Sequence, residues 1–163
     1  MRTMRYLAAT ALVAVSLQSG LTAQPTDTFY NTAGKLGITA GYPYLGLRYD
    51  FTDLMAGELR GAFDGGVAAI GYRQYFNILQ FFQLRVFAGG EASYVMFNNV
   101  DELTGSGFLV GLFGGGEFFV TDWFGLAMDF GPAYVALGTD QAGTSYTAGG
   151  VELILNLGVN FYF

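Results

Sequence analysis

The 163-residue chain contains neither cysteine nor histidine. Without cysteine it cannot form the disulfides on which small secreted domains often rely, and it has no thiolate to act as a nucleophile or zinc ligand. Without histidine, a nucleophile activated by an imidazole base cannot be assembled. The two absences exclude cysteine- and histidine-based chemistry and favour a fold that is closed by backbone hydrogen bonds.

Long apolar runs and basic residues are scarce as well. After residue 23 the longest stretch without a charged residue is 103–116, which is glycine-rich, so no segment is expected to cross a membrane as a helix. Only five basic residues accompany thirteen acidic ones after residue 23, and we therefore expect no nucleic-acid partner. The glycine run at 114–116 lies inside an alternating segment, so it does not match a phosphate-binding loop that opens a helix.

The N-terminus has the pattern of a secretory signal. Arg2 and Arg5 precede the apolar stretch 6–17, and Ala23 ends a plausible cleavage site. The alternative, a retained membrane anchor, requires about 20 apolar residues, more than this stretch contains. We therefore predict an exported protein with a cleaved signal peptide at 1–23, a short periplasmic tail at 24–33 and a single domain at 34–163.

Alternation of apolar and polar residues dominates the rest of the chain, whose mean hydropathy is +0.38. High hydrophobicity without a spanning helix leaves the closed β-barrel as the structure that satisfies every backbone group in lipid. We therefore predict an all-β fold, an eight-stranded antiparallel up-and-down transmembrane β-barrel. The expected strands are 34–42, 44–51, 55–63, 66–76, 81–94, 107–119, 123–136 and 149–163.

The breaks between these segments differ in length. The stretches FTDLM (51–55) and VTDWF (120–124) resemble one short turn used twice, and we assign them to the periplasmic side. The longer polar stretches 96–107 and 138–148 are expected to be external loops. Short periplasmic turns and longer external loops are typical of outer-membrane barrels.

The charged residues all fall on one face of the expected strands or in turns, loops and the tail. In the last segment, apolar residues from Val151 to Phe163 alternate with a polar face, on which Ile154 is the exception. A charge facing mid-bilayer lipid costs about 2–4 kcal/mol, so we assign the charged face to the interior. The inward charged set is Lys35, Arg48, Asp50, Glu58, Arg60, Arg73, Arg85, Glu91, Glu117, Asp129 and Glu152.

Nearly balanced charges inside a narrow barrel predict a packed ionic plug, with a pore or a binding pocket as the alternative. If the first Thr-Asp turn centres on Asp53, Arg48 lies opposite Glu58. Inward-facing aromatic residues and glycines are interpreted as interior packing around the long charged side chains. Turns centred near Leu79, at Val100 to Asp101 and at Trp123 would place Arg73, Arg85, Glu117 and Asp129 in one row.

A carboxylate pair such as Glu117 and Asp129 also suggests acid–base catalysis, but arginines beside it favour a structural role. We predict no catalytic residue, no cofactor and no metal site. The acids of the external loops leave open a divalent cation that bridges to lipopolysaccharide phosphates, although scattered loop acids are usually only solvated.

The C-terminal stretch NLGVNFYF carries Asn156, Gly158, Phe161 and Phe163 in the spacing polar, Gly, aromatic, aromatic. In this pattern, and in the stretch 48–63, the chain resembles small eight-stranded outer-membrane barrels, such as the transmembrane domain of outer membrane protein A and its opacity-like relatives. The resemblance implies the outer membrane of a Gram-negative bacterium, with lipid and lipopolysaccharide around the barrel. It also implies that the barrel assembly machinery recognises these four residues.

The expected function is a non-enzymatic structural or interaction component of the cell envelope, because barrel-type outer-membrane enzymes rely on a histidine. The alternatives are an anchor subunit of a larger envelope complex, a small passive channel or apolar-solute carrier, and a soluble lipocalin-like secreted barrel. Envelope proteins are the expected partners. The expected interfacial aromatic residues are Tyr42, Tyr49, Trp123 and Phe124, together with Phe161 and Phe163.

Overall fold

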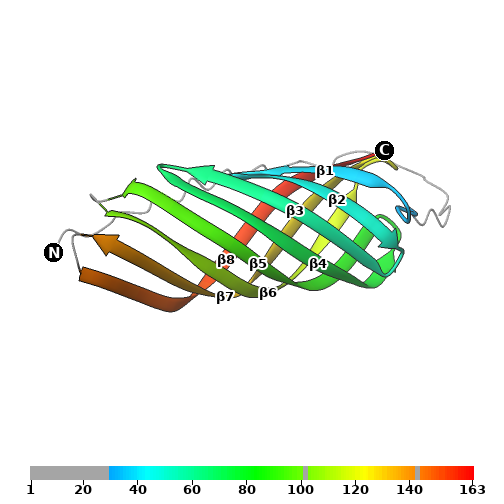
Figure 1. Cartoon of the computed structure of the whole chain (residues 1–163). Coiled ribbons are helices and arrows are strands. Elements are labelled where there is room, and N and C mark those ends of the chain that lie inside the picture. The colour runs from blue at the N-terminus through cyan, green and yellow to red at the C-terminus, as the bar shows by residue number, and fades with distance from the viewer. Residues whose placement is uncertain (1–29, 101–102, 142–143) are drawn as a thin grey trace, which may run out of the picture.

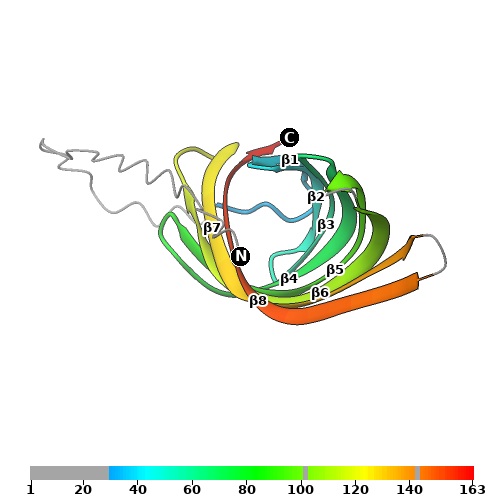
Figure 2. The same ribbon diagram turned by 90° about the vertical axis from the view of Figure 1, so that its left-hand side faces the viewer.

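The structure is a computed structural model that describes residues 30–100, 103–141 and 144–163. Each strand pairs antiparallel with the next, and β1 also pairs with β8, so the sheet closes into one ring (Figures 1 and 2). The predicted all-β, eight-stranded, up-and-down arrangement is confirmed. The strands are β1 (Leu36–Gly41), β2 (Tyr44–Thr52), β3 (Met55–Asp64), β4 (Val67–Phe81), β5 (Leu84–Val100), β6 (Leu103–Phe119), β7 (Phe124–Gln141) and β8 (Thr144–Tyr162).

The strands are strongly staggered around the ring. A row of paired residues that starts at Gly37 on β1 passes through all the strands and reaches Glu152 on β8. When the β8–β1 register is continued beyond the paired residues, Glu152 is level with position 47. The row therefore ends about ten residues away from Gly37, where it began, and this difference is the stagger of the ring. A ring of eight strands with such a stagger has strands tilted by roughly 40° from its axis.

The wall of the ring is much taller on one side than on the other. Strands β1 to β3 have 6 to 10 residues, whereas β4 to β8 have 15 to 19. β8 pairs with β1 only through residues 158–162, so its first part, 144–157, has β7 as its only paired strand. β7 and β8 consequently project beyond the rest of the ring, at the lower left of Figure 1, and lean away from it in Figure 2.

The two ends of the ring are distinct. We call the end with the connections after β2, β4 and β6 the tight-turn end, and it also holds Phe163. We call the opposite end, with the connections after β1, β3, β5 and β7, the hairpin end. In the described part of the chain, no helix is long and apolar enough to cross a membrane.

Two expectations about the connections are wrong. Most of the expected loops 96–107 and 138–148 is strand, because β5 extends to Val100, β6 begins at Leu103, β7 extends to Gln141 and β8 begins at Thr144. A polar composition reports contact with water, and an antiparallel hairpin can continue to pair in water. The turn expected near Leu79 lies at residues 82–83, because β4 bulges between Asn77 and Leu79 and continues to Phe81.

The two faces of the strands separate side chains by polarity. On β8, Val151, Leu153, Leu155 and Leu157 point outward and are exposed. No Lys, Arg, Asp or Glu side chain that the structure describes lies on the outward face of a strand. The interior contains the buried charged residues and a small aromatic cluster of Tyr75, Phe87 and Phe113 with Ala56. The polarity is therefore the reverse of that in a water-soluble sheet, which places its apolar face inside.

Candidate functional site

The interior of the ring is packed with ion pairs, most of which join residues of different strands. The predicted inward residues that join these ion pairs are Arg48, Asp50, Glu58, Arg60, Arg73, Arg85, Glu91, Glu117 and Asp129. Most of them are buried, and Arg48, Arg73, Arg85, Glu58, Glu117 and Asp50 are among the most completely buried side chains. We call this set of nine residues the ionic plug.

Arg85 of β5 is the centre of the plug near the tight-turn end. Its Nη1 donates to Asp50 Oδ2 at 2.9 Å and to Thr32 Oγ1 at 2.6 Å. Its Nη2 donates to Glu117 Oε2 at 2.6 Å and to the Tyr162 hydroxyl at 2.7 Å. One guanidinium thus connects β2, β5, β6, β8 and the segment before β1, and the planar donor geometry of arginine suits such forked contacts.

Glu117 and Arg48 complete this cluster near the tight-turn end. Glu117 Oε1 accepts hydrogen bonds from Asn160 Nδ2 and from the Tyr162 hydroxyl, both at 2.7 Å. Arg48 Nε donates to Asp50 Oδ1 at 2.7 Å, and its Nη1 lies 3.8 Å from Glu117 Oε2. Each buried carboxylate therefore has two arginines near it, which offsets the cost of taking the charges out of water.

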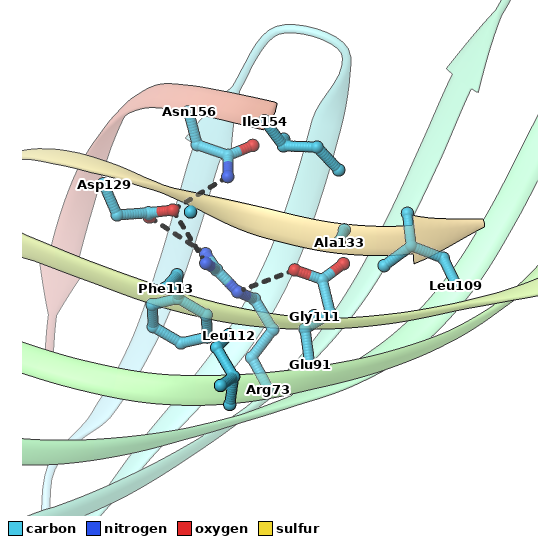
Figure 3. A pocket seen from close by; sticks show the side chains of 11 residues that line it. Arg73, Glu91, Leu109, Gly111, Leu112, Phe113, Asp129, Ala133, Ile154 and Asn156 are labelled. Carbon is cyan, nitrogen blue, oxygen red and sulfur yellow. Dashed lines mark hydrogen bonds and ion pairs between the residues drawn. The ribbon is translucent and has the colours of Figure 1, made fainter. Parts of the chain in front are cut away.

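Arg73 of β4 is the centre of a second cluster nearer the hairpin end (Figure 3). Its two terminal nitrogens donate to the two oxygens of Asp129 on β7, at 2.8 and 3.0 Å. Its Nε lies 3.0 Å from Glu91 Oε2, and Nη1 also donates to the Tyr75 hydroxyl at 3.1 Å. Asn156 Nδ2 donates to Asp129 at 2.8 Å, so this carboxylate is held by β4 and β8 together.

Glu58 of β3 connects the plug to the low side of the wall. It accepts hydrogen bonds from Arg60 Nε at 2.8 Å, from the Tyr75 hydroxyl at 2.7 Å and from Thr39 Oγ1 at 3.0 Å. The Arg60 guanidinium lies 3.7 Å from the centre of the Tyr44 ring, within the range of a cation–π contact. The Tyr75 hydroxyl therefore joins Glu58 to Arg73 and lies between the clusters.

Two of the predicted pairings between strands are correct. The predicted single row of Arg73, Arg85, Glu117 and Asp129 is wrong. Arg48 faces Glu58 and Arg85 faces Glu117, as expected. Arg73 faces Glu91 instead of Arg85, because the β4–β5 turn lies beyond Leu79, and Asp129 faces Gly115 instead of Glu117. Arg73, Arg85, Glu117 and Asp129 are therefore divided between two clusters.

Two of the predicted inward charges take no part in the plug. Lys35 lies just before β1, where its Nζ donates to the carbonyl of Asp122 at 3.3 Å. Glu152 faces Ala133 on the inward side of β8, but it is exposed because β1 does not extend that far. Neither residue appears among the ion pairs of the described residues. The sequence did not show that β1 is too short to face this part of β8.

The plug also depends on uncharged polar residues that were not among the predicted site residues. The alternation already places Tyr75, Asn160 and Tyr162 on the inward face, but their hydrogen bonds to the plug were not predicted. Thr32 carried no such signal, because it belongs to the predicted tail and lies in the interior only when the segment before β1 turns inward. Its hydroxyl donates to Asp50, and nearby Tyr30 stacks on Phe119 with ring centroids 5.3 Å apart. The predicted signal peptide, 1–23, lies outside the described residues.

The predicted interfacial aromatics lie at both ends of the ring. Trp123 stacks on Phe161 with centroids 6.2 Å apart, and Phe124 lies 5.1 Å from Phe161, forming an aromatic group at the tight-turn end. Tyr49 contacts Phe51 near the same end. At the hairpin end Tyr42 is 81% exposed, and its hydroxyl donates to Asp64 at 3.3 Å.

The four predicted assembly-signal residues all lie near the β8–β1 seam or the plug. Asn156 holds Asp129, and the Phe163 N–H donates to the Leu36 carbonyl at 2.9 Å. A side chain at Gly158 would collide with the Tyr44 hydroxyl and lie 2.9 Å from the Ala40 carbonyl oxygen, so glycine leaves room there for the Tyr44 side chain. Phe161 pairs with Ile38 across the seam.

No protein-family model matches the chain, and no curated protein matches it in sequence. The resemblance to small outer-membrane barrels therefore rests on the sequence patterns alone and remains a prediction. In the residues that the structure describes, no group of three acidic side chains is placed to hold a metal ion. The geometry of the interior suits cross-bracing between strands.

Proposed function

We propose that the protein is an integral outer-membrane β-barrel of a Gram-negative-type bacterium. Its interior is closed by the ionic plug, and it serves as a structural or interaction component of the cell envelope. The observation that carries this proposal is an apolar outward band of similar height on β6 and β7 that is bordered by aromatic residues at both edges.

The band is clearest on β7, between Phe124 and Tyr134. The outward residues between them include Leu126, Met128 and Phe130, which are 46, 52 and 56% exposed. Ten residues of strand span about 33 Å, and a tilt of roughly 40° reduces this to about 25 Å along the barrel axis. Lipid-facing bands of outer-membrane barrels are about 25 Å tall and carry aromatic girdles at both edges.

The same spacing recurs on neighbouring strands. Phe118 and Phe108 bound the outward face of β6, and Phe108 contacts Tyr134 of β7 with centroids 6.5 Å apart. On β5 the outward face extends from Leu84 to Tyr94, which is paired with Phe108. Phe118 and Phe124 thus mark one edge of the band on β6 and β7, and Tyr94, Phe108 and Tyr134 mark the other edge on β5, β6 and β7, which supports the proposal. A water-soluble lipocalin-like barrel has no need of such a band.

The plug favours a closed barrel over a passive channel. Arg48, Arg73 and Arg85 are each 1% exposed and span the interior between strands that are not neighbours. A water path through this region would require ion pairs and hydrogen bonds to break together, and removing one partner of a buried pair costs about 3–5 kcal/mol. Interactions with other molecules are therefore assigned to the outer surface and the ends.

An arginine scan along one outward face of β7 tests the proposal. Met128→Arg places a charge in the middle of the band, and Ala136→Arg places the same charge beyond Tyr134 on the same strand and face. In lipid vesicles the first substitution should reduce the free energy of unfolding by about 2–4 kcal/mol and the second by about 0–1 kcal/mol. Equal and small costs for both would overturn membrane insertion, because water does not distinguish the two positions.

A further inference from the structure

We propose that the unpaired edge of β8, residues 144–157, binds an extended segment of another protein by β-strand addition. We call this stretch the free edge. The inference deepens the interaction role of the proposed function, because it names the surface and the kind of partner. The site follows from the strand register alone, whereas the choice of another protein over a second copy of this chain rests on the proposed membrane insertion.

The backbone of the free edge presents a regular row of hydrogen-bonding groups. Near the end of β8, the Tyr162 N–H donates to Trp123 on the β7 side, and the Phe163 N–H donates to Leu36 on the β1 side. The β7–β8 register has no shift, so this alternation holds along the whole strand. The odd-numbered residues of 145–155 therefore direct their N–H and C=O groups away from β7, and no described strand pairs with them there.

The free edge is long and accessible. β1 pairs with β8 only as far as Gly158, and β7 and β8 project beyond the rest of the ring (Figures 1 and 2). Every residue from Thr147 to Leu153 is exposed. At Gly149 and Gly150 the strand carries no side chain, and glycine in a strand often marks a place where another backbone approaches closely. A further strand can therefore lie along this edge.

Features that normally protect a sheet edge are scarce here. Edge strands are usually shortened, bent by a bulge or interrupted by proline or lysine. The free edge contains neither proline nor lysine, and β8 pairs with β7 without a bulge. Its only charged residue is Glu152, which faces inward and is exposed. Because opposite charges stabilise a cross-strand pair, the free edge favours a strand with a basic residue opposite Glu152.

The outward face of the free edge defines the rest of the partner. Val151, Leu153 and Leu155 point outward and are 73, 76 and 63% exposed. Val151 pairs with Tyr134, so these three residues lie beside the apolar band of β7. Unpaired backbone groups are costly at that level of a bilayer, and an acyl chain has no donor or acceptor for them. A peptide strand with apolar outward and polar inward residues satisfies both the backbone and the side chains.

A second copy of the chain in the same membrane does not fit the free edge. Antiparallel pairing of two β8 strands requires a two-fold axis perpendicular to the sheet, which turns one barrel upside down. A two-fold axis along the membrane normal keeps both barrels upright, but two strands that are each tilted by roughly 40° then cross at about 80°. Neighbouring strands of a sheet differ by only about 20–25°. The occupant is therefore a different polypeptide.

Hydrogen exchange tests the free edge residue by residue. The full chain without residues 1–23 is isotope-labelled, placed in detergent micelles and followed by NMR at the backbone amides of 147–155. The probe is a blocked nine-residue peptide that alternates valine and threonine from an initial valine, with lysine as its fourth residue and a polyethylene glycol chain at its C-terminus. Paired antiparallel from Leu155 to Thr147, it places the lysine opposite Glu152 and directs its valine N–H groups toward β8.

Without the probe, the odd-numbered amides should exchange at least tenfold faster than the even-numbered amides, which are bonded to β7. The probe should slow the odd-numbered amides by at least tenfold. Methylation of its three central valine nitrogens should abolish this protection, whereas methylation of its three threonine nitrogens, which face away from β8, should not. Glu152→Gln should weaken binding of the probe about threefold, but not binding of a probe with glutamine in place of the lysine.

Val151→Pro supplies a matched test on the protein side. It removes one N–H of the free edge without removing a hydrogen bond to β7, and edge strands tolerate proline at such positions. It should weaken probe binding at least tenfold, whereas Val151→Ala, which keeps the N–H, should weaken it less than about threefold. Continued protection of the even-numbered amides verifies that each variant is folded.

Odd-numbered amides that are already protected without the probe would overturn the proposal, as would equal effects of the two methylated probes. Protection that appears when the protein concentration alone is raised would assign the edge to a second copy and overturn the choice of partner. The arginine scan of β7 tests insertion separately. If Met128→Arg and Ala136→Arg are equally mild while the probe protects the odd-numbered amides, insertion fails and the free edge stands. If only the probe fails, the free edge is refuted and insertion stands.

Discussion

Arg73 of β4 and Asp129 of β7 form an ion pair with two hydrogen bonds, at 2.8 and 3.0 Å, across the interior of the ring. The strands that carry them are not neighbours in the sheet. The pair therefore braces the ring across its interior, independently of the backbone ladders. Its energetic contribution depends on both partners being present, because either charge alone would be buried without compensation.

Removal of both partners should therefore cost less than the sum of the two single removals. Arg73→Met and Asp129→Leu should each lower the free energy of unfolding by about 3 kcal/mol. The double variant should be clearly more stable than the sum of the two losses predicts. Urea unfolding in detergent micelles, followed by the fluorescence of Trp123, measures all three. Additive losses in the double variant would show that the two side chains do not stabilise each other.

Substitution of Arg85 by lysine should be nearly as damaging as its removal. The two terminal nitrogens of Arg85 contact Thr32, Asp50, Glu117 and Tyr162, and a single ammonium cannot reproduce that fork. We expect Arg85→Lys to destabilise the protein by about 2–4 kcal/mol. Heat-modifiable migration on gels and urea unfolding are the measurements. A loss below about 1 kcal/mol would indicate that only the charge of Arg85 matters. Gln80→Leu, which removes a neutral partner of the Tyr30 carbonyl nearby, is the control.

The protein should not conduct ions in planar bilayers. Arg48, Arg85, Glu117 and Phe119 are almost completely buried at the tight-turn end, so in the described part of the chain these side chains are shielded from water. Single-channel recordings across both polarities are expected to show no steady openings above the bilayer background. Regular openings in the unmodified protein would contradict the closed plug and would favour the passive-channel alternative.

Trp123 offers a direct measurement of position in the bilayer, because it is the only tryptophan of the chain. It is exposed and stacks on Phe161 at the tight-turn end. Its fluorescence should be quenched most strongly by lipids brominated near the head group and weakly by lipids brominated at the end of the acyl chain. Equal quenching at all depths, or none, would place this end of the ring outside the membrane interface.

Phe163→Asp should impair insertion during assembly more than it destabilises the assembled protein. The Phe163 side chain is exposed, while its N–H bonds to Leu36 whatever the side chain is. We expect reduced levels in the outer-membrane fraction of cells but unfolding within about 1 kcal/mol of the unmodified protein after refolding into micelles. Phe82→Asp, at an exposed turn of the same end, is the control. Normal levels in the membrane fraction would contradict the assembly role of this residue.

The faces of the strands could be predicted from sequence because alternation is local. A strand places residues i and i+2 on one side whatever its partners are, so the inward positions of Arg48, Arg73, Arg85 and Glu117 followed from parity. The number of strands and their up-and-down order followed from the same periodicity together with short connections. Ile154 is the exception on the polar face, and only the neighbouring strands show that it lies where β1 does not face β8.

Only the tertiary structure decided which charges meet and where the wall is low. A bulge between Asn77 and Leu79 and a turn at residues 82–83 moved Arg73 opposite Glu91. The stagger of the ring brought Arg73 to Asp129, and the unequal strand lengths left Glu152 exposed beside Ile154. These relationships depend on the register of every strand around a closed ring. The sequence by itself determined which side chains face inward, because parity is a property of two residues, whereas contact across the interior is a property of all eight strands together.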